Sequence, residues 1–111
     1  MERDMRIAGI GCRPGTPLAD LRAALQAAGG ADALATVPDR AAEIRPLADA
    51  LSLPLHLVQV AGIATPTQSA RVNAAFGTGS VAEAAAIAVC GRLTHPRRIF
   101  GPITIAIAEV P

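Results

Sequence analysis

The chain has 111 residues, of which 51% are hydrophobic, enough to build the core of one domain over residues 1–111. Aromatic residues make up only 2%, with no tryptophan or tyrosine, so the stacking platforms of single-stranded nucleic-acid binders are excluded. The net charge of +1 provides no general attraction to nucleic acid or to a membrane surface, and we expect neither as a partner.

The two cysteines, Cys12 and Cys90, lie far apart and outside any CxxC pair. Together with two histidines they give no metal-ligand spacing, so we expect reduced thiols, no metal and no cofactor. The charged start at 1–4 is not followed by the apolar stretch of a signal peptide, and no apolar run reaches membrane-spanning length. These features predict a cytoplasmic protein.

The first third of the chain predicts a strand, a tight turn and a helix. Residues 6–11 form a short buried strand, and residues 12–15 form the turn. Thr16 is suited to cap the following helix and Pro17 to its first position, while Gly29-Gly30 ends it.

The middle of the chain predicts two more strands around a second helix. The strands cover 33–37 and 55–60. Asp39 caps the helix between them, and we expect an interruption near Pro46 because an internal proline removes a helical hydrogen bond. Strands that alternate with helices indicate a parallel sheet covered on both sides.

The last part of the chain predicts a short helix that opens at 65–68 and ends near Phe76, then an alanine-rich helix over 81–90 that ends at Gly91. Residues 97–108 form a closing hairpin around a Gly-Pro turn. In its second strand the isoleucines face one side and smaller residues the other. We therefore predict an α/β fold with three layers, α/β/α, and a mixed, mostly parallel sheet of about five strands ending in an antiparallel hairpin.

The first of two glycine-rich turns, at 9–16, follows a strand and leads into a helix. Such a loop lets backbone N–H groups approach a phosphate or carboxylate. It has neither the Walker A nor the GxGxxG spacing, so a plain tight turn is the alternative, and Arg13 favours a ligand by adding a guanidinium. The candidate ligand-binding residues are Gly11, Cys12, Arg13 and Thr16.

The second turn, at 77–80, leads into the alanine-rich helix. Ser80 and Glu83 have the spacing of a capping box, and the helix start offers unpaired N–H groups to an anion. Two glycines around a hydroxyl exceed what capping requires, so the candidate ligand-binding residues are Gly77, Thr78, Gly79 and Ser80. The spacing of Glu83 favours a capping role, and a catalytic role as general base is the alternative.

Arg97 and Arg98 are adjacent in a predicted strand, so they face opposite sides and at most one enters a site. Arg97 is our candidate for ligand binding, and the alternative is an edge strand kept from aggregating by its charges. The sequence shows no Ser-His-Asp set and no pair of carboxylates with evident mutual geometry.

Five segments in order carry a family resemblance: GIGCRPGT at 9–16, LATV at 34–37, PTQS at 66–69, GSVAEAAA at 79–86 and FGPITIAIA at 100–108. Together they resemble the CobE family of cobalamin biosynthesis, which also occurs as the C-terminal domain of CbiG. The match covers nearly the whole chain. The basic residues expected in the family's hairpin are Arg97 and Arg98 here.

The resemblance implies a role in building the corrin ring, with a precorrin or corrinoid as the small-molecule partner. In CbiG the implied reaction hydrolyses a lactone derived from ring A and releases a two-carbon aldehyde. This chain holds only the C-terminal domain, which favours a stand-alone protein of the CobE type, associated with the aerobic pathway.

Three roles stay open from the sequence. The chain binds and carries a corrin intermediate, or it hydrolyses a precorrin lactone with Glu83 as the base and Cys12 as a less favoured nucleophile. Alternatively, it is an interaction domain that works with another enzyme of the corrin pathway.

Overall fold

The structure is a computed structural model that describes residues 5–90 and 92–110. Strands and helices alternate through the first half of the chain, as the sequence predicts. In chain order the elements are β1 (Met5–Gly11), α1 (Leu18–Ala27), β2 (Ala33–Thr36), a 3₁₀ turn (Pro38–Arg40), α2 (Ala41–Leu51), β3 (Leu55–Leu57), α3 (Ala70–Phe76), α4 (Val81–Cys90), β4 (Leu93–Phe100) and β5 (Ile103–Val110).

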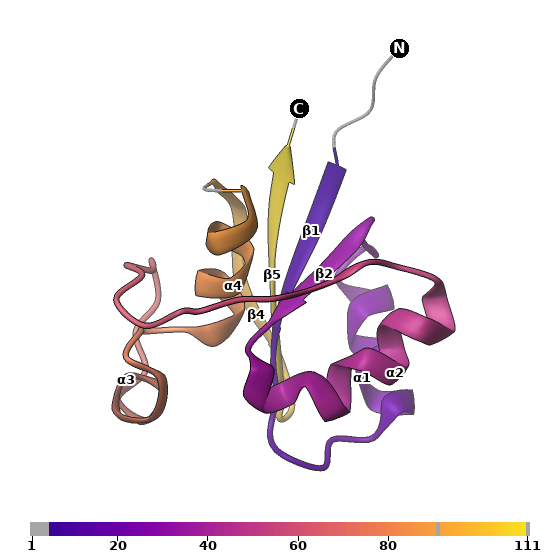
Figure 1. The fold of residues 1–111 in the computed structure, drawn as a ribbon, viewed down its shortest axis with the longest axis horizontal. Coiled ribbons are helices and arrows are strands. Elements are labelled where there is room, and N and C mark those ends of the chain that lie inside the picture. Colours follow the sequence, from indigo (N-terminus) through magenta and orange to yellow (C-terminus); the bar gives the residue numbers. More distant parts are fainter. Residues whose placement is uncertain (1–4, 91, 111) are drawn as a thin grey trace.

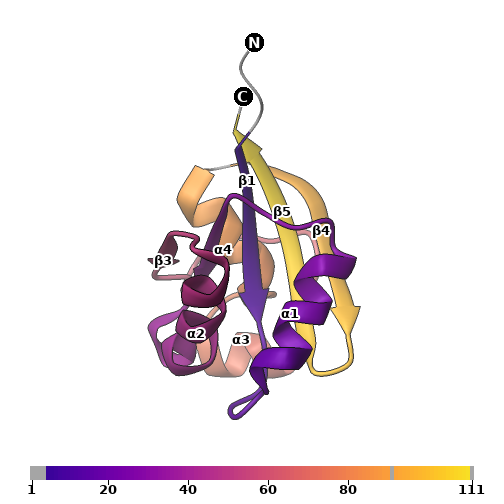
Figure 2. The ribbon, with the colours of Figure 1, turned by 90° about the vertical axis from the view of Figure 1, so that its right-hand side faces the viewer.

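The five strands form one sheet in the order β3-β2-β1-β5-β4. The pairs β1–β2 and β2–β3 are parallel, whereas β5 is antiparallel to both β1 and β4, so four strands share one direction and β5 opposes them. Helices α1 and α2 cover one face and α4 covers the other, with α3 beside it (Figures 1 and 2). The predicted three-layer α/β/α fold with a mixed, mostly parallel sheet is confirmed.

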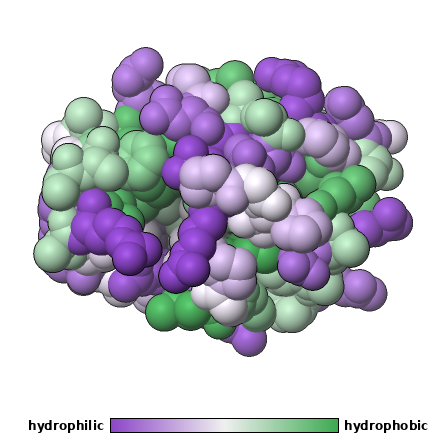
Figure 3. Space-filling model, turned by 90° about the horizontal axis from the view of Figure 1, so that it is seen from below, coloured by the Kyte–Doolittle hydropathy of each residue, from purple (hydrophilic) through white to green (hydrophobic). Residues whose placement is uncertain are grey.

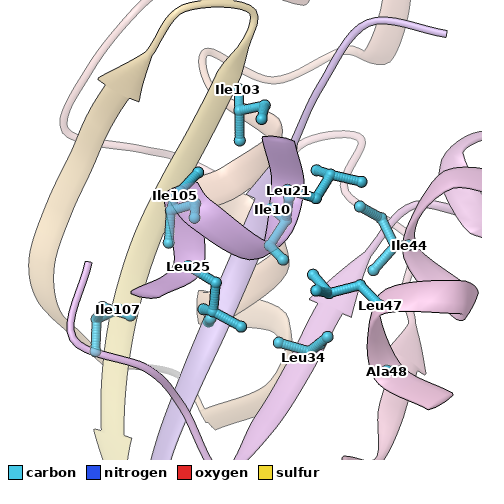
Figure 4. Packing of buried hydrophobic residues seen from close by; sticks show 12 residues of the cluster. Ile10, Leu21, Leu25, Leu34, Ile44, Leu47, Ala48, Ile103, Ile105 and Ile107 are labelled. Atoms are coloured by element: carbon cyan, nitrogen blue, oxygen red, sulfur yellow. The ribbon is translucent and has the colours of Figure 1, made fainter. Parts of the chain in front are cut away.

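One face of the sheet forms the larger aliphatic core with α1 and α2. Leucines from both helices pack against Ile10 of β1 and three isoleucines of β5 (Figure 4). These isoleucines, Ile103, Ile105 and Ile107, all face this core, while Ala108 belongs to the cluster under α4. The predicted alternation along β5 is therefore confirmed.

The other face packs very closely on α4. A Cβ atom added to Gly9 of β1 would overlap the carbonyl oxygen of Ala82 and lie 2.8 Å from the amide nitrogen of Ala86. Residues 81–86 of α4 are all buried, and four of these six are alanines. The small side chains bring the helix backbone into contact with the sheet, which explains why this segment is rich in alanine.

Two predicted helix caps are wrong. The residue before α1 is Pro17, which makes no side-chain capping bond, and the Thr16 hydroxyl instead donates to the Arg13 carbonyl at 2.7 Å. Asp39 lies inside the 3₁₀ turn, and the residue before α2 is Arg40, again without a side-chain cap. In both places a local turn replaces the cap.

The expected interruption near Pro46 is also wrong, because α2 runs unbroken from Ala41 to Leu51. Ile44, Leu47 and Ala48 are buried on both sides of the proline. Their burial offsets the hydrogen bond that the proline removes.

The third strand and the short helix are both shorter than predicted. Strand β3 ends at Leu57 because the chain then turns so that Val60 is buried in the cluster under α4. Helix α3 ends at Phe76 as predicted but begins only at Ala70, where the Ser69 hydroxyl accepts a bond from the Val72 amide at 3.4 Å.

Helix α4 covers Val81–Cys90 as predicted, and its expected end at Gly91 lies outside the described residues. Across residues 5–90 and 92–110, no single helix is long and apolar enough to cross a membrane; α3 and α4 reach that length and composition only as a pair bent by 56°.

The contact between Gly9 and α4 predicts a large effect of one methyl group. Gly9→Ala has to push the helix backbone away from the sheet, and we expect a loss of about 3 kcal/mol in the free energy of unfolding. Urea unfolding measures it. The control is Gly30→Ala, where φ is +76° but no atom lies within 4 Å, so only backbone strain of about 1 kcal/mol applies. Equal losses in the two variants would contradict the close packing.

Candidate functional site

A cavity of about 350 Å³ opens where β1 and β4 end at the same edge of the sheet. Ligands of open α/β sheets bind at such carboxyl ends. Seen from this end, the surface is hollowed between hydrophilic side chains, and the part over α3 is hydrophobic (Figure 3). The lining comes from the end of β1 and the loop after it, from the 3₁₀ turn after β2, from α3 and the residue before it, from the start of α4 and from the β4–β5 hairpin.

The charged residues that line the cavity, among those described, are all arginines, and none is acidic: Arg13, Arg40, Arg71 and Arg97. They come from four different parts of the chain, namely the loop after β1, the turn after β2, helix α3 and strand β4. This arrangement creates a positively charged cavity in a protein whose net charge is only +1.

The Arg40 side chain is already bound to other groups of the protein. Its Nε donates to the Cys12 carbonyl at 2.8 Å, one terminal nitrogen donates to the Asp39 carbonyl at 3.0 Å, and its guanidinium lies 5.8 Å from the centre of the Phe76 ring. Arg40 therefore connects three walls of the cavity.

The other three guanidinium groups are available to a ligand. Within residues 5–90 and 92–110, the side chains of Arg13, Arg71 and Arg97 donate to no protein acceptor. The same cavity has an apolar wall made by Val72, Ala75 and Phe76 of α3 together with Val81 of α4. The cavity thus combines free cationic groups with an apolar surface.

Arg97 and Arg98 face opposite sides of the sheet, as predicted. Arg97 lines the cavity, whereas the Arg98 guanidinium lies 5.2 Å from the centre of the Phe100 ring and donates to the Ala27 carbonyl at the end of α1 at 3.4 Å. Of these two neighbouring arginines, Arg97 is therefore the one that can contact a ligand in this cavity.

The structure separates the two predicted glycine turns. From the first turn, Gly11, Cys12 and Arg13 line the cavity with Arg97, but Thr16 does not. The second turn lies outside the lining: the Thr78 hydroxyl donates to the Ile63 carbonyl at 2.6 Å, and the Ser80 hydroxyl accepts from the Glu83 amide at 3.3 Å. The ligand-binding roles of Thr16, Gly77, Thr78, Gly79 and Ser80 stay predictions.

Glu83 is fully buried and does not line the cavity. Ser80 provides its half of the predicted capping box, but the Glu83 carboxylate turns to other partners. Oε1 accepts from the amide and the hydroxyl of Thr67 at 3.0 and 2.6 Å, and Oε2 accepts from the Arg97 amide at 2.9 Å. A general-base role for Glu83 stays a prediction.

Two of the four cavity arginines, Arg40 and Arg71, were not predicted from the sequence. Arg40 ends the 3₁₀ turn that follows β2, and its position after a parallel strand is a signal that could have identified it, because the carboxyl ends of parallel strands meet at one edge of the sheet. Arg71 carries no comparable signal. Its place depends on how the chain between β3 and α4 folds back over the sheet, which no local pattern reveals.

Cys12, in the loop after β1, is a half-buried thiol that lines the cavity. Burial raises its pKa because the thiolate loses hydration. A hydrogen bond with Thr16 lowers the pKa in part; of the two nearby charges, Glu43 raises it and Arg40 lowers it. The net direction is upward, so Cys12 is a protonated thiol at neutral pH.

The raised pKa predicts slow alkylation. In a Cys90→Ser background, iodoacetamide reacts only with the Cys12 thiolate, so the rate should rise with pH through a midpoint above that of the same protein unfolded in urea. Measuring the alkylated fraction by mass against pH gives both midpoints. A folded-state midpoint equal to or below the unfolded one would contradict the burial of this thiol.

The fold and the site define a small α/β protein with a cationic cavity at the carboxyl edge of its sheet. Residues 6–108 match the family model described as cobalamin synthesis G C-terminus. The chain belongs to this family, and it is a cobalamin biosynthesis protein of the CobE/CbiG C-terminal type. The expected family resemblance is confirmed.

Two solved structures are similar to the chain over nearly its whole length. One is CobE, described as a protein from the cobalamin (vitamin B12) biosynthetic pathway, with 30% identity, a TM-score of 0.77 and coverage of 99% of this chain and 93% of that one. The other is the cobalamin biosynthesis protein chiG from Agrobacterium tumefaciens str. C58, with 36% identity, a TM-score of 0.63 and coverage of 95% and 97%. A comparison with curated proteins gave no significant match.

Proposed function

We propose that this protein binds a precorrin or corrinoid intermediate through carboxylates at the edge of the macrocycle. The observation that carries the proposal is the set of three free guanidinium groups, those of Arg13, Arg71 and Arg97, around a cavity whose described lining holds no acidic residue. A ligand with several separated carboxylates complements this pattern, and each charge-assisted hydrogen bond contributes roughly 1.5–3 kcal/mol.

The apolar wall of the cavity supports the same class of ligand. A corrin precursor has a broad, largely apolar ring edged with acetate and propionate groups. Phe76 and the neighbouring aliphatic residues of α3 offer a surface for the ring, while the arginines hold its edge. The cavity measures about 350 Å³, at the small end of the range for ligand sites, so we expect one edge of the ring to enter it.

A binding and carrying role is favoured over hydrolysis. Acyl or lactone hydrolysis needs a nucleophile or a water beside a general base. Among the described residues that line the cavity, Cys12 is the one thiol, its pKa is raised, and neither a carboxylate nor a histidine lines the cavity beside it. The membership in a cobalamin-biosynthesis family and the pathway named for CobE support the class of ligand.

An absorbance titration with hydrogenobyrinic acid, a metal-free corrinoid, tests the proposal. We expect a saturable spectral shift, and each of Arg13→Met, Arg71→Met and Arg97→Met should weaken binding about tenfold, the value of one charge-assisted contact. Arg45→Met removes an exposed arginine of α2 outside the cavity and is the matched control, with no expected change.

The mass of the recovered pigment decides between the roles. An unchanged mass after prolonged incubation supports a carrier. A changed mass would replace the carrier role by an enzymatic one, and the mass lost would name the reaction. If the shift is absent, or if the three cavity variants bind as tightly as wild type, the proposed site is wrong.

A further inference from the structure

Strand β4 carries an irregularity at the residue that enters the cavity. His95 pairs with Ile107 and Arg98 with Ile105, so three steps along β4 correspond to two along β5. Such a bulge leaves one residue out of the ladder and changes the direction of its side chain. Arg97 lies in this stretch and lines the cavity.

The Arg97 amide lies in the stretch of β4 that has no register partner on β5, at the edge of the sheet. It donates to Oε2 of Glu83 at 2.9 Å. The preceding residue is Pro96, which has no N–H group of its own. The Glu83 carboxylate is therefore the partner that holds this part of β4 in its bulged form.

The other oxygen of the same carboxylate holds the opposite wall. Oε1 accepts two bonds from Thr67, two residues before Ser69, which caps the helix α3 that carries Arg71. Thr67 and α3 belong to the segment 62–77, which we call the excursion. A bond from the Gly62 amide to the Gly77 carbonyl at 2.8 Å joins its two ends. Glu83 thus joins the excursion to β4.

We propose that Glu83 is a positioning residue that sets the spacing between the two walls of the cavity, and with it the separation of the Arg71 and Arg97 guanidinium groups. The inference rests on the proposed function, because its purpose is to match the separation of two ligand carboxylates. The carboxylate serves backbone and hydroxyl donors, so both guanidinium groups keep their charge free for the ligand. A buried carboxylate with three donors is satisfied in place, which makes it a rigid connection.

Glu83→Gln tests this role, because glutamine has one acceptor oxygen where the carboxylate has two. It cannot serve both backbone N–H donors, those of Thr67 and Arg97, and so it releases one wall. The bond from the Glu83 amide to Ser80 is unaffected. We expect hydrogenobyrinic acid to bind about tenfold more weakly to this variant.

A double-mutant cycle separates positioning from a general structural role. If Glu83 acts through the arginines, Glu83→Gln should cause less than about a twofold further loss in an Arg97→Met or an Arg71→Met background. In an Arg13→Met background the full loss should remain, since Arg13 lies on a loop that Glu83 does not touch. Equal losses in all three backgrounds would overturn the inference.

A milder pair of variants covers the case in which Glu83→Gln does not fold. Thr67→Val removes only the hydroxyl bond to Glu83, and we expect binding about threefold weaker. Thr65→Val, in the same segment, removes a bond to the Thr67 carbonyl at 2.8 Å but leaves Glu83 intact, and it should bind as wild type does. Equal effects of the two would overturn the inference. Failure of the wild type to bind the pigment would instead overturn the proposed function itself.

Discussion

The close packing of α4 on β1 is the constraint on which the rest of this structure depends. Gly9 has no side chain, so the backbone of α4 lies directly on the sheet at Ala82 and Ala86. The first turn of the helix is thereby held beside Gly11 at the end of β1. A bulkier residue at this contact would move the start of α4, and the cavity wall at Val81 and the buried Glu83 would move with it.

This placement explains how a buried carboxylate and a cationic cavity lie close together in the structure. Glu83 would neutralise the cavity if it paired with a guanidinium, but its three donors are two amides and a hydroxyl. Among the four arginines that line the cavity, Arg40 is the one that the fold holds, through the carbonyl oxygens of Cys12 and Asp39 and the Phe76 ring. The positive charge of Arg13, Arg71 and Arg97 is therefore left for a ligand.

The sequence predicted those features of the fold and the site that depend on the periodicity of a single strand or helix. The alternation along β5, the extent of α4 and the opposite directions of Arg97 and Arg98 follow from strand and helix periodicity. The burial of residues 78–80, the partners of Glu83 and the presence of Arg71 in the cavity depend instead on how residues 58–76 fold over the sheet, which no local pattern reveals. Ser80 and Glu83 have the spacing of a capping box, yet tertiary contacts decide where the carboxylate goes. Pro46 shows the same effect, since core packing outweighs a local helix breaker.

A crystal structure of the protein with hydrogenobyrinic acid tests the central claim most directly. The account predicts the edge of the pigment in the cavity at the ends of β1 and β4, with its carboxylates on Arg13, Arg71 and Arg97 and its ring against α3. Pigment bound elsewhere, for example in the groove between α1 and α2 near Arg22 and Leu53, with the cavity arginines unengaged, would contradict it.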